Sequence, residues 1–203
     1  MEEIKILKME EKHLEEVSLL HMEAFKDYPS VKLGKIYIKA FLKLFLESKF
    51  SICFVAVEGT KICGYVIGIE KDKLKIKKIF PIIFLSFLRK PYLIFNKRML
   101  NKIYQKIRNL LKIDKEILTL LPASFISIVG IGVAPENKGR GIGYSLMEAF
   151  EEEAIKLGYK AMRLSVYSNN KPARRLYEKR GWKPFLLPFN YLYYYKIFDY
   201  DKK

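Results

Sequence analysis

The 203-residue chain is expected to fold as an α/β protein with one mixed sheet flanked by helices. Half of its residues are apolar and 14% are aromatic, which is enough material for a hydrophobic core. Segments rich in β-branched residues alternate with segments whose apolar residues recur at helical spacing. The expected order is β-α-α-β-β, an insert, and then β-α-β-α-β-β, in a single domain over residues 1–203.

The first third of the chain is expected to hold a short strand, two amphipathic helices and a hairpin. The first helix places Leu14 and Val17 on one face, and its first turn is acidic, which suits the positive end of the helix dipole. The hairpin is indicated by two β-rich runs that meet at a Glu-Gly-Thr-Lys turn. These elements span residues 4–7, 10–25, 36–46, 50–57 and 62–69.

The hairpin predicts that the two cysteines form no disulfide. If residues 59–60 make a two-residue turn, Ala56 lies opposite Cys63. Cys53 then lies opposite Val66, and the two thiols point to opposite faces of the sheet. We therefore interpret both cysteines as buried, small apolar residues.

Residues 71–122 differ in composition from the rest and are interpreted as a basic insert. They contain 14 Lys and Arg against three Asp and Glu, a balance of +11 within a chain total of +16. The insert is expected to be mainly helical, with breaks near Pro81 and Pro91. Its apolar run over residues 79–88 has ten residues, short of the roughly 20 that span a bilayer.

Three roles for the insert remain open at this stage. It is either a helical lid that shapes an acceptor site, or a platform for an anionic membrane or a lipid-linked substrate, or a stabilising or oligomerising decoration. No nucleic-acid-binding motif accompanies the charge, so nucleic acid is not an expected partner. The N-terminus lacks the features of a secretory signal, so we expect a cytoplasmic protein that touches a membrane at most peripherally.

The last third is expected to alternate strands and helices and to end in a strand pair. Gly158 closes the long helix at its C-terminal end. The short helix after it is entered through Asn170 and Pro172 and is stopped by Gly181. The elements span residues 125–133, 141–157, 161–167, 172–180, 182–185 and 191–198.

The turn between the first of these strands and the long helix is glycine-rich and predicts a phosphate site. Gly139, Gly141 and Gly143 remove side chains where the chain turns, and the free N–H groups of the helix point back into the turn. Lys138 and Arg140 add positive charge. The spacing fits neither the dinucleotide-binding G-x-G-x-x-G pattern nor the Walker pattern with its Gly-Lys-Ser/Thr ending.

Two blocks of sequence resemble the GNAT superfamily of acyl-CoA-dependent N-acetyltransferases. Residues 138–143, Lys-Gly-Arg-Gly-Ile-Gly, resemble its Q/R-x-x-G-x-G/A signature, with Lys138 in the place of Gln or Arg. Residues 170–182 match its N-x-x-A-x-x-L-Y-x-x-x-G-F/W pattern at every key position. The resemblance is strong over residues 124–185 and implies a GNAT-type mixed sheet with two splayed parallel strands.

The resemblance also implies how acetyl-CoA would bind. The pantetheine arm would lie between the two splayed strands and pair with the backbone near Ile131, Gly132 and Val133. The pyrophosphate would lie against the N–H groups of the glycine turn, and Asn170 would contact the pantetheine arm. The implied pyrophosphate-binding residues are Lys138, Gly139, Arg140, Gly141, Ile142 and Gly143.

The implied activity is transfer of an acetyl group from acetyl-CoA to a primary amine by direct attack, without a covalent enzyme intermediate or a metal. Tyr177 would protonate the leaving thiolate, or would alternatively be a packed aromatic residue. No acidic residue lies on the first splayed strand, so Ser127, a glutamate elsewhere or ordered water would relay the amine proton. His13 and His21 lie eight residues apart on the first helix and do not predict a metal site.

The sequence leaves the acceptor open among a protein N-terminus, a lysine, an amino sugar, a polyamine and an antibiotic. It also leaves open a homodimer, formed through the tyrosine-rich last strand. The rival interpretation is a non-catalytic module that binds CoA or nucleotides, or a membrane-surface adaptor, on the same fold. The two motif blocks favour the enzyme.

Overall fold

The computed structural model describes residues 2–70, 73, 78, 80–89, 119–186 and 191–199. Its centre is a seven-stranded mixed sheet with the strand order β1-β2-β3-β4-β5-β7-β6. Neighbouring strands are antiparallel except for β4 and β5, which are parallel. The strands are β1 (Ile4–Lys8), β2 (Ser51–Glu58), β3 (Lys61–Glu70), β4 (Phe125–Val133), β5 (Ala161–Tyr167), β6 (Lys183–Leu186) and β7 (Tyr191–Ile197).

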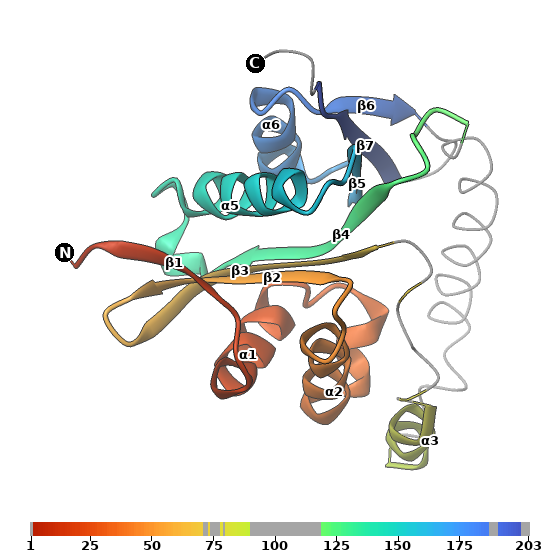
Figure 1. Ribbon diagram of the computed structural model, residues 1–203. Helices are drawn as coiled ribbons and strands as arrows, with labels where there is room; N and C mark the ends of the chain where they lie inside the picture. The colour runs from red at the N-terminus through yellow and green to blue at the C-terminus, as the bar shows by residue number, and fades with distance from the viewer. Residues whose placement is uncertain are drawn as a thin grey trace.

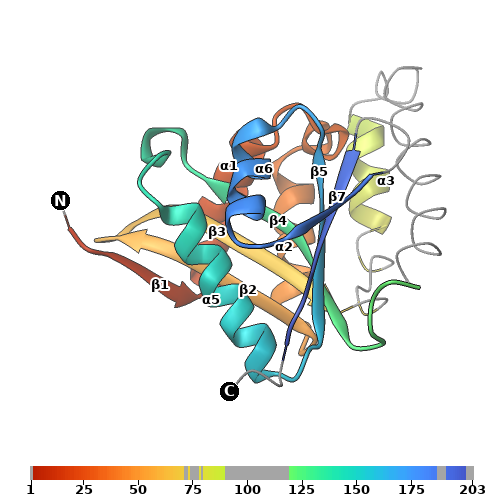
Figure 2. The ribbon, with the colours of Figure 1, turned by 90° about the horizontal axis from the view of Figure 1, so that it is seen from above.

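Helices cover both faces of this sheet (Figure 1). One face carries α1 and α2, and the other carries α5 and α6, with α5 lying across β2 and β3 (Figure 2). The α-helices are α1 (Leu14–Ala24), α2 (Lys35–Leu46), α3 (Phe80–Arg89), α5 (Ile142–Lys156) and α6 (Lys171–Lys179). Short 3-10 helices are η1 (Glu11–His13), η2 (Pro29–Leu33) and η5 (Pro135–Asn137).

The two faces of the sheet bury two separate hydrophobic clusters. Under α5 and α6, Phe150, Leu146 and Val66 are buried with Trp182 and Tyr194. Under α1 and α2, a second cluster joins side chains of both helices to β2 and β3, including Leu42, Phe45, Val55, Tyr65 and Ile67. Since β2 and β3 send side chains alternately to both clusters, these two strands are fixed in register from both sides.

The predicted element order is confirmed, and the bounds of β4 and β5 agree to the residue. Pro81, predicted as a break, instead lies in the first turn of α3, where the missing N–H would have no helical partner in any case. The remaining insert positions, including Pro91, lie outside the described residues. Within the described residues, α3 lies against α2 and η2.

The hairpin register differs from the prediction by a bulge. Val57 lies opposite Ile62 as expected, but the register shifts between Ala56 and Val57, so that Ala56 faces Gly64. Cys53 consequently lies opposite Ile67, not Val66. Cys63 is the extra residue, which keeps it on the α5 side while Cys53 packs on the α2 side, and both thiols are free. The prediction of opposite faces is therefore right, although its register was wrong.

Candidate functional site

The parallel strands β4 and β5 separate after their first four residue pairs. They pair from Phe125 with Ala161 to Ile128 with Leu164. β4 continues to Val133 and β5 to Tyr167, yet no pairing joins these last residues in the part of the chain that the structure describes. The carboxyl ends therefore present two facing backbone edges with hydrogen-bonding groups to satisfy.

A bulge accompanies this separation. On its other edge, β4 pairs with β3, and the register shifts between Ile67 and Gly68, which leaves Val129 as the extra residue. Val129 is 44% exposed although it lies in a central strand. A bulge bends its strand and increases the local twist, so it accounts for the turn of β4 away from β5 at this position.

The glycine turn follows β4 and leads into α5. Gly139 and Gly141 have φ angles of +81° and +80°, a region that favours glycine. A Cβ on either residue would meet no atom within 4 Å, so the turn faces open space. Gly143 differs, because it lies inside α5 and its Cβ would come 3.3 Å from Leu176 of α6, so its role in the fold is close helix packing.

Five backbone N–H groups gather at this turn. The Lys138 N–H donates to the Pro135 carbonyl. Among the described residues, no backbone carbonyl accepts from the N–H groups of residues 139–143. Together with the positive end of the 15-residue helix α5, they form an opening that suits an anion such as a pyrophosphate.

The hairpin of β2 and β3 holds the side of the turn. The Arg140 guanidinium forms two hydrogen bonds to the Glu58 carboxylate, at 2.8 and 2.7 Å. Lys61 pairs with Glu136 at 2.8 Å. The structure thus brings Arg140 to the predicted place but pairs its charge with a carboxylate, while the exposed Lys138 has no ion pair with a described residue.

Asn170 and Tyr177 lie on the other side of the strand separation, where Asn170 is the N-cap residue of α6 and Tyr177 lies within the helix. The Asn170 side chain caps this helix, since it accepts a hydrogen bond of 3.3 Å from the Ala173 N–H. Tyr177 is 4% exposed and packs against Trp182 and Tyr194. Burial raises the pKa of the Tyr177 hydroxyl, so it stays protonated near neutral pH and is a weaker acid than an exposed tyrosine.

Three further tyrosines, which the sequence analysis did not single out, surround this place. Tyr28, just before η2, stacks at a tilt on Tyr167 at the end of β5, with ring centroids 4.6 Å apart. Burial raises the pKa of Tyr28, and the nearby Tyr167 and Tyr177 raise it further. Tyr28 in turn raises the pKa of the buried Tyr65 of β3, after the larger effect of burial. Hydroxyl groups from both faces of the sheet therefore approach one another where β4 and β5 separate.

Ser127 lies away from the place where β4 and β5 separate. It is in the paired part of β4, and its hydroxyl accepts a hydrogen bond of 2.9 Å from the Arg163 guanidinium. His13 binds the Glu10 N–H through Nδ1 and so closes the turn before α1. The described residues contain no group of three or more potential metal-ligating side chains.

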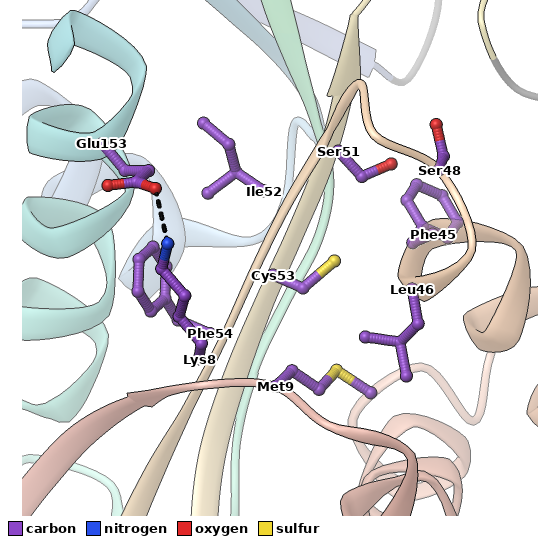
Figure 3. A pocket seen from close by; sticks show the side chains of 10 residues that line it. All are labelled: Lys8, Met9, Phe45, Leu46, Ser48, Ser51, Ile52, Cys53, Phe54 and Glu153. Atoms are coloured by element: carbon purple, nitrogen blue, oxygen red, sulfur yellow. Dashed lines mark hydrogen bonds and ion pairs between the residues drawn. The ribbon is translucent and has the colours of Figure 1, made fainter. Parts of the chain in front are cut away.

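A separate cavity of about 160 Å³ opens where β2 begins, at the end of the sheet away from the glycine turn (Figure 3). Met9, Phe45 and Cys53 line it together with the ion pair of Lys8 and Glu153. Burial raises the pKa of the Cys53 thiol to about 12, so the thiolate is scarce near neutral pH. Cys53 is therefore not an activated nucleophile.

No helix in the described part of the chain is long and apolar enough to cross a membrane.

Residues 14–182 match the family model described as "Acetyltransferase (GNAT) family". No match was found among curated proteins.

Solved acetyltransferase structures share the fold. A polyamine N-acetyltransferase from Drosophila melanogaster aligns over 97% of this chain and 100% of its own, at 14% identity and a TM-score of 0.66. The ribosomal-protein-S18-alanine N-acetyltransferase from Escherichia coli aligns over 99% of both chains, at 13% identity and a TM-score of 0.60. A PaiA N-acetyltransferase from Thermoplasma acidophilum, in complex with coenzyme A, aligns over 97% and 99%, at 15% identity and a TM-score of 0.60. Identities this low establish a shared fold and no more.

Proposed function

The chain belongs to the acetyltransferase (GNAT) family, an acyl-CoA N-acyltransferase family, and we propose that it transfers an acetyl group from acetyl-CoA to a primary amine by direct attack. The separation of β4 and β5, followed at once by an open glycine turn, is the observation that carries the proposal. It offers an extended slot for a pantetheine arm and an anion site for a pyrophosphate in one continuous path. A non-catalytic module would need neither the donor Tyr177 nor the surrounding hydroxyls at the end of that slot.

We propose that the backbone groups of Ile131, Gly132 and Val133 pair with the amides of the pantetheine arm, as an added strand would. This fits because these residues lie on the edge of β4 that β5 leaves unpaired. Asn170 would contact the same arm with the part of its side chain that capping leaves available.

The pyrophosphate is proposed to lie against the N–H groups of Gly139, Arg140, Gly141, Ile142 and Gly143. Lys138 would add charge from solvent. Nothing within 4 Å would obstruct an anion at the side-chain positions of the two positive-φ glycines. The fit to a phosphate group thus rests on open donors and open space together.

When bound, acetyl-CoA supplies an acyl group activated as a thioester. The chain's own part is to exclude water, to polarise the carbonyl with a backbone N–H of the separated part of β4, and to move two protons. Tyr177 is proposed to give its hydroxyl proton to the departing sulfur, because its hydroxyl stays protonated near neutral pH. The amine must also lose a proton, and that step is taken up in the next section.

The basic insert is proposed to shape the acceptor side of this site as a lid. Its described helix α3 lies against η2, which begins directly after Tyr28. A membrane platform remains the competing role, and α3 exposes Phe84 and Leu88 by 65% and 62%. Co-sedimentation with anionic vesicles at low salt separates the two, because the lid predicts no binding and the platform predicts salt-sensitive binding.

Turnover of acetyl-CoA against a panel of amines tests the proposed function. The structural relatives named above are described as acetylating acceptors as different as a polyamine and a protein alanine. The panel should therefore include polyamines, peptide N-termini, lysine peptides and amino sugars. We expect amine-dependent release of the CoA thiol with formation of an N-acetyl product. Tight CoA binding without amine-dependent release for any acceptor would contradict the proposal.

A further inference from the structure

A buried hydrogen bond joins His21 of α1 to Tyr65 of β3. The Tyr65 hydroxyl lies 2.6 Å from His21 Nδ1. His21 is 7% exposed and Tyr65 is fully buried, so the contact is shielded from bulk water. A polar pair of this kind is retained in a hydrophobic cluster only when it is satisfied internally, and a distance of 2.6 Å indicates a strong bond.

Two glycines of β4 make room for the Tyr65 ring. Tyr65 lies opposite Gly132, where a Cβ would come within 2.8 Å of its Cε1 atom. A Cβ on Gly130 would lie 3.4 Å from the Tyr65 hydroxyl oxygen. The ring therefore fills the space that a side chain at residue 132 would need, and the hydroxyl lies beside Gly130, within the stretch that has separated from β5.

This position supplies what β4 itself lacks. The strand has no ionisable side chain between Phe125 and Val133, and Ser127 lies at its paired end. The Tyr65 hydroxyl is instead brought to the separated end from the neighbouring strand, on the face where α1, α2 and Tyr28 border the site. With the acyl group in the proposed slot, the group that takes a proton from the acceptor amine would lie at this end of β4.

The surroundings set the protonation states of the pair. Burial raises the pKa of Tyr65 well above its usual value, and the nearby Tyr28 raises it further, so Tyr65 is a neutral hydroxyl. Phe25 stacks on the His21 imidazole at 4.7 Å, and Phe41 of α2 meets it edge-on at 6.4 Å. Besides His21, the ionisable Tyr28 is close enough to Tyr65 to raise its pKa.

We propose that Tyr65 and His21 form the proton relay that activates the acceptor amine, an inference that rests on the proposed acetyltransferase function. An N–H bond of the ammonium group breaks as an O–H bond forms at Tyr65, directly or through one water molecule. The original hydroxyl proton of Tyr65 passes to Nδ1 of His21, which becomes an imidazolium. The amine retains the electron pair with which it attacks the acyl carbon. Tyr65 is the catalytic residue, and His21 is a positioning residue that acts through it and holds the proton.

The tautomer of His21 tests this relay without acetyl-CoA. The relay requires Tyr65 to donate to an unprotonated Nδ1, with the imidazole proton on Nε2. Long-range ¹H–¹⁵N correlation spectra of the unliganded protein at pH 8 should show this tautomer, and Tyr65→Phe should shift the Nδ1 resonance. A proton on Nδ1 at that pH would overturn the proposal, because the nitrogen could then accept none.

Rate profiles against pH provide the kinetic test. With an amine that the wild type acetylates, kcat/KM should rise with pH and level off below the pKa of the free amine. In Tyr65→Phe it should fall about 10²–10⁴-fold at pH 7 and keep rising towards the pKa of the free amine. His21→Asn retains an acceptor for the Tyr65 hydroxyl but holds no proton, so it should show the same loss and the same profile.

Controls separate this inference from stability and from the proposed function. Tyr159→Phe removes a part-buried hydroxyl, bonded to Glu70 at 3.3 Å near the start of β5, and should leave the profile unchanged. CoA affinity by calorimetry should be within about twofold of wild type in every variant. If the wild type is active and both variants reproduce its pH profile, the relay is overturned, but the proposed acetyltransferase function still stands. If Tyr65→Phe fails to fold, the rate profile of His21→Asn and the wild-type spectra still test the relay.

Discussion

Glu151 lies at the centre of a buried ion cluster between α5 and the last strands, and neutralising it should destabilise the fold strongly. One carboxylate oxygen accepts from the Arg180 guanidinium at 3.0 Å and from the Trp182 indole at 2.9 Å. The other accepts from Arg180 at 3.0 Å and from the Lys196 ammonium at 2.8 Å. The side chains of Glu151 and Arg180 are only 6% and 8% exposed, so solvent cannot replace the lost partner.

The expected magnitude follows from this geometry. Glu151→Gln conserves volume but leaves the buried Arg180 with a longer ion pair of 3.6 Å to the half-exposed Glu148. The new amide group also presents donors where acceptors are needed. Breaking one side of a buried ion pair costs about 3–5 kcal/mol. In a chain of this length, that lowers the melting temperature by about 6–20 °C. Urea unfolding and thermal melts at pH 7 measure both, and the exposed neighbour Glu152→Gln should change stability by less than about 0.5 kcal/mol.

The sign of the pH dependence of stability follows from the shifted pKa of Glu151. Burial by itself raises the pKa of the Glu151 carboxyl, but hydrogen bonds from Arg180, Lys196 and Trp182 outweigh it, and the net pKa is lowered. A carboxyl with a folded pKa below its unfolded value of about 4.3 stabilises the fold above that value, and the stabilisation is lost as pH falls through the folded pKa. The difference between wild type and Glu151→Gln should therefore be complete above about pH 5 and shrink below about pH 4. A variant as stable as wild type at pH 7, or a difference that grows in acid, would refute the reasoning.

Three further variants test the binding site and the donor. Gly141→Glu places a negative side chain in the open turn and should weaken CoA binding by more than about 2 kcal/mol, and unchanged affinity by calorimetry would remove the turn as the phosphate site. Tyr177→Phe should lower turnover about 10²–10⁴-fold with little change in CoA affinity, whereas full activity would mean that water supplies the proton. Glu58→Gln releases Arg140 and removes a negative charge beside the turn. CoA should therefore bind roughly two- to tenfold tighter at low salt, and this gain in affinity should fade at high salt. Weaker binding would show that the ion pair is needed to hold the turn.

Local patterns predict most of this fold because its elements are delimited by local chemistry. Gly158, Asn170 and Gly181 mark helix ends through backbone conformation and capping, which depend on a few neighbouring residues. The bounds of β4 follow from a β-branched run, and turns on either side delimit both β4 and β5. The glycine turn was likewise located by sequence, since its shape depends on residues 139 and 141 themselves.

The features that sequence did not predict depend on which distant residues meet. The bulge at Val129 arises from how β3 and β4 fit together, and no residue type marks it. Tyr65 and His21 are 44 positions apart, so neither spacing nor motif joins them. One signal was present: Gly130 and Gly132 in a β-rich run indicate close approach by another group, and here that group is the Tyr65 ring.

A crystal structure with bound CoA tests the central claim most directly, because the claim is that the separation of β4 and β5 is the cofactor slot. The account predicts that the pantetheine arm lies between residues 129–133 and 165–167 and hydrogen-bonds to the free edge of β4. It also predicts that the pyrophosphate contacts the N–H groups of residues 139–143 and that the sulfur ends near Tyr177. CoA bound at any other place, with β4 and β5 closed on each other up to Val133 and Tyr167, would contradict it.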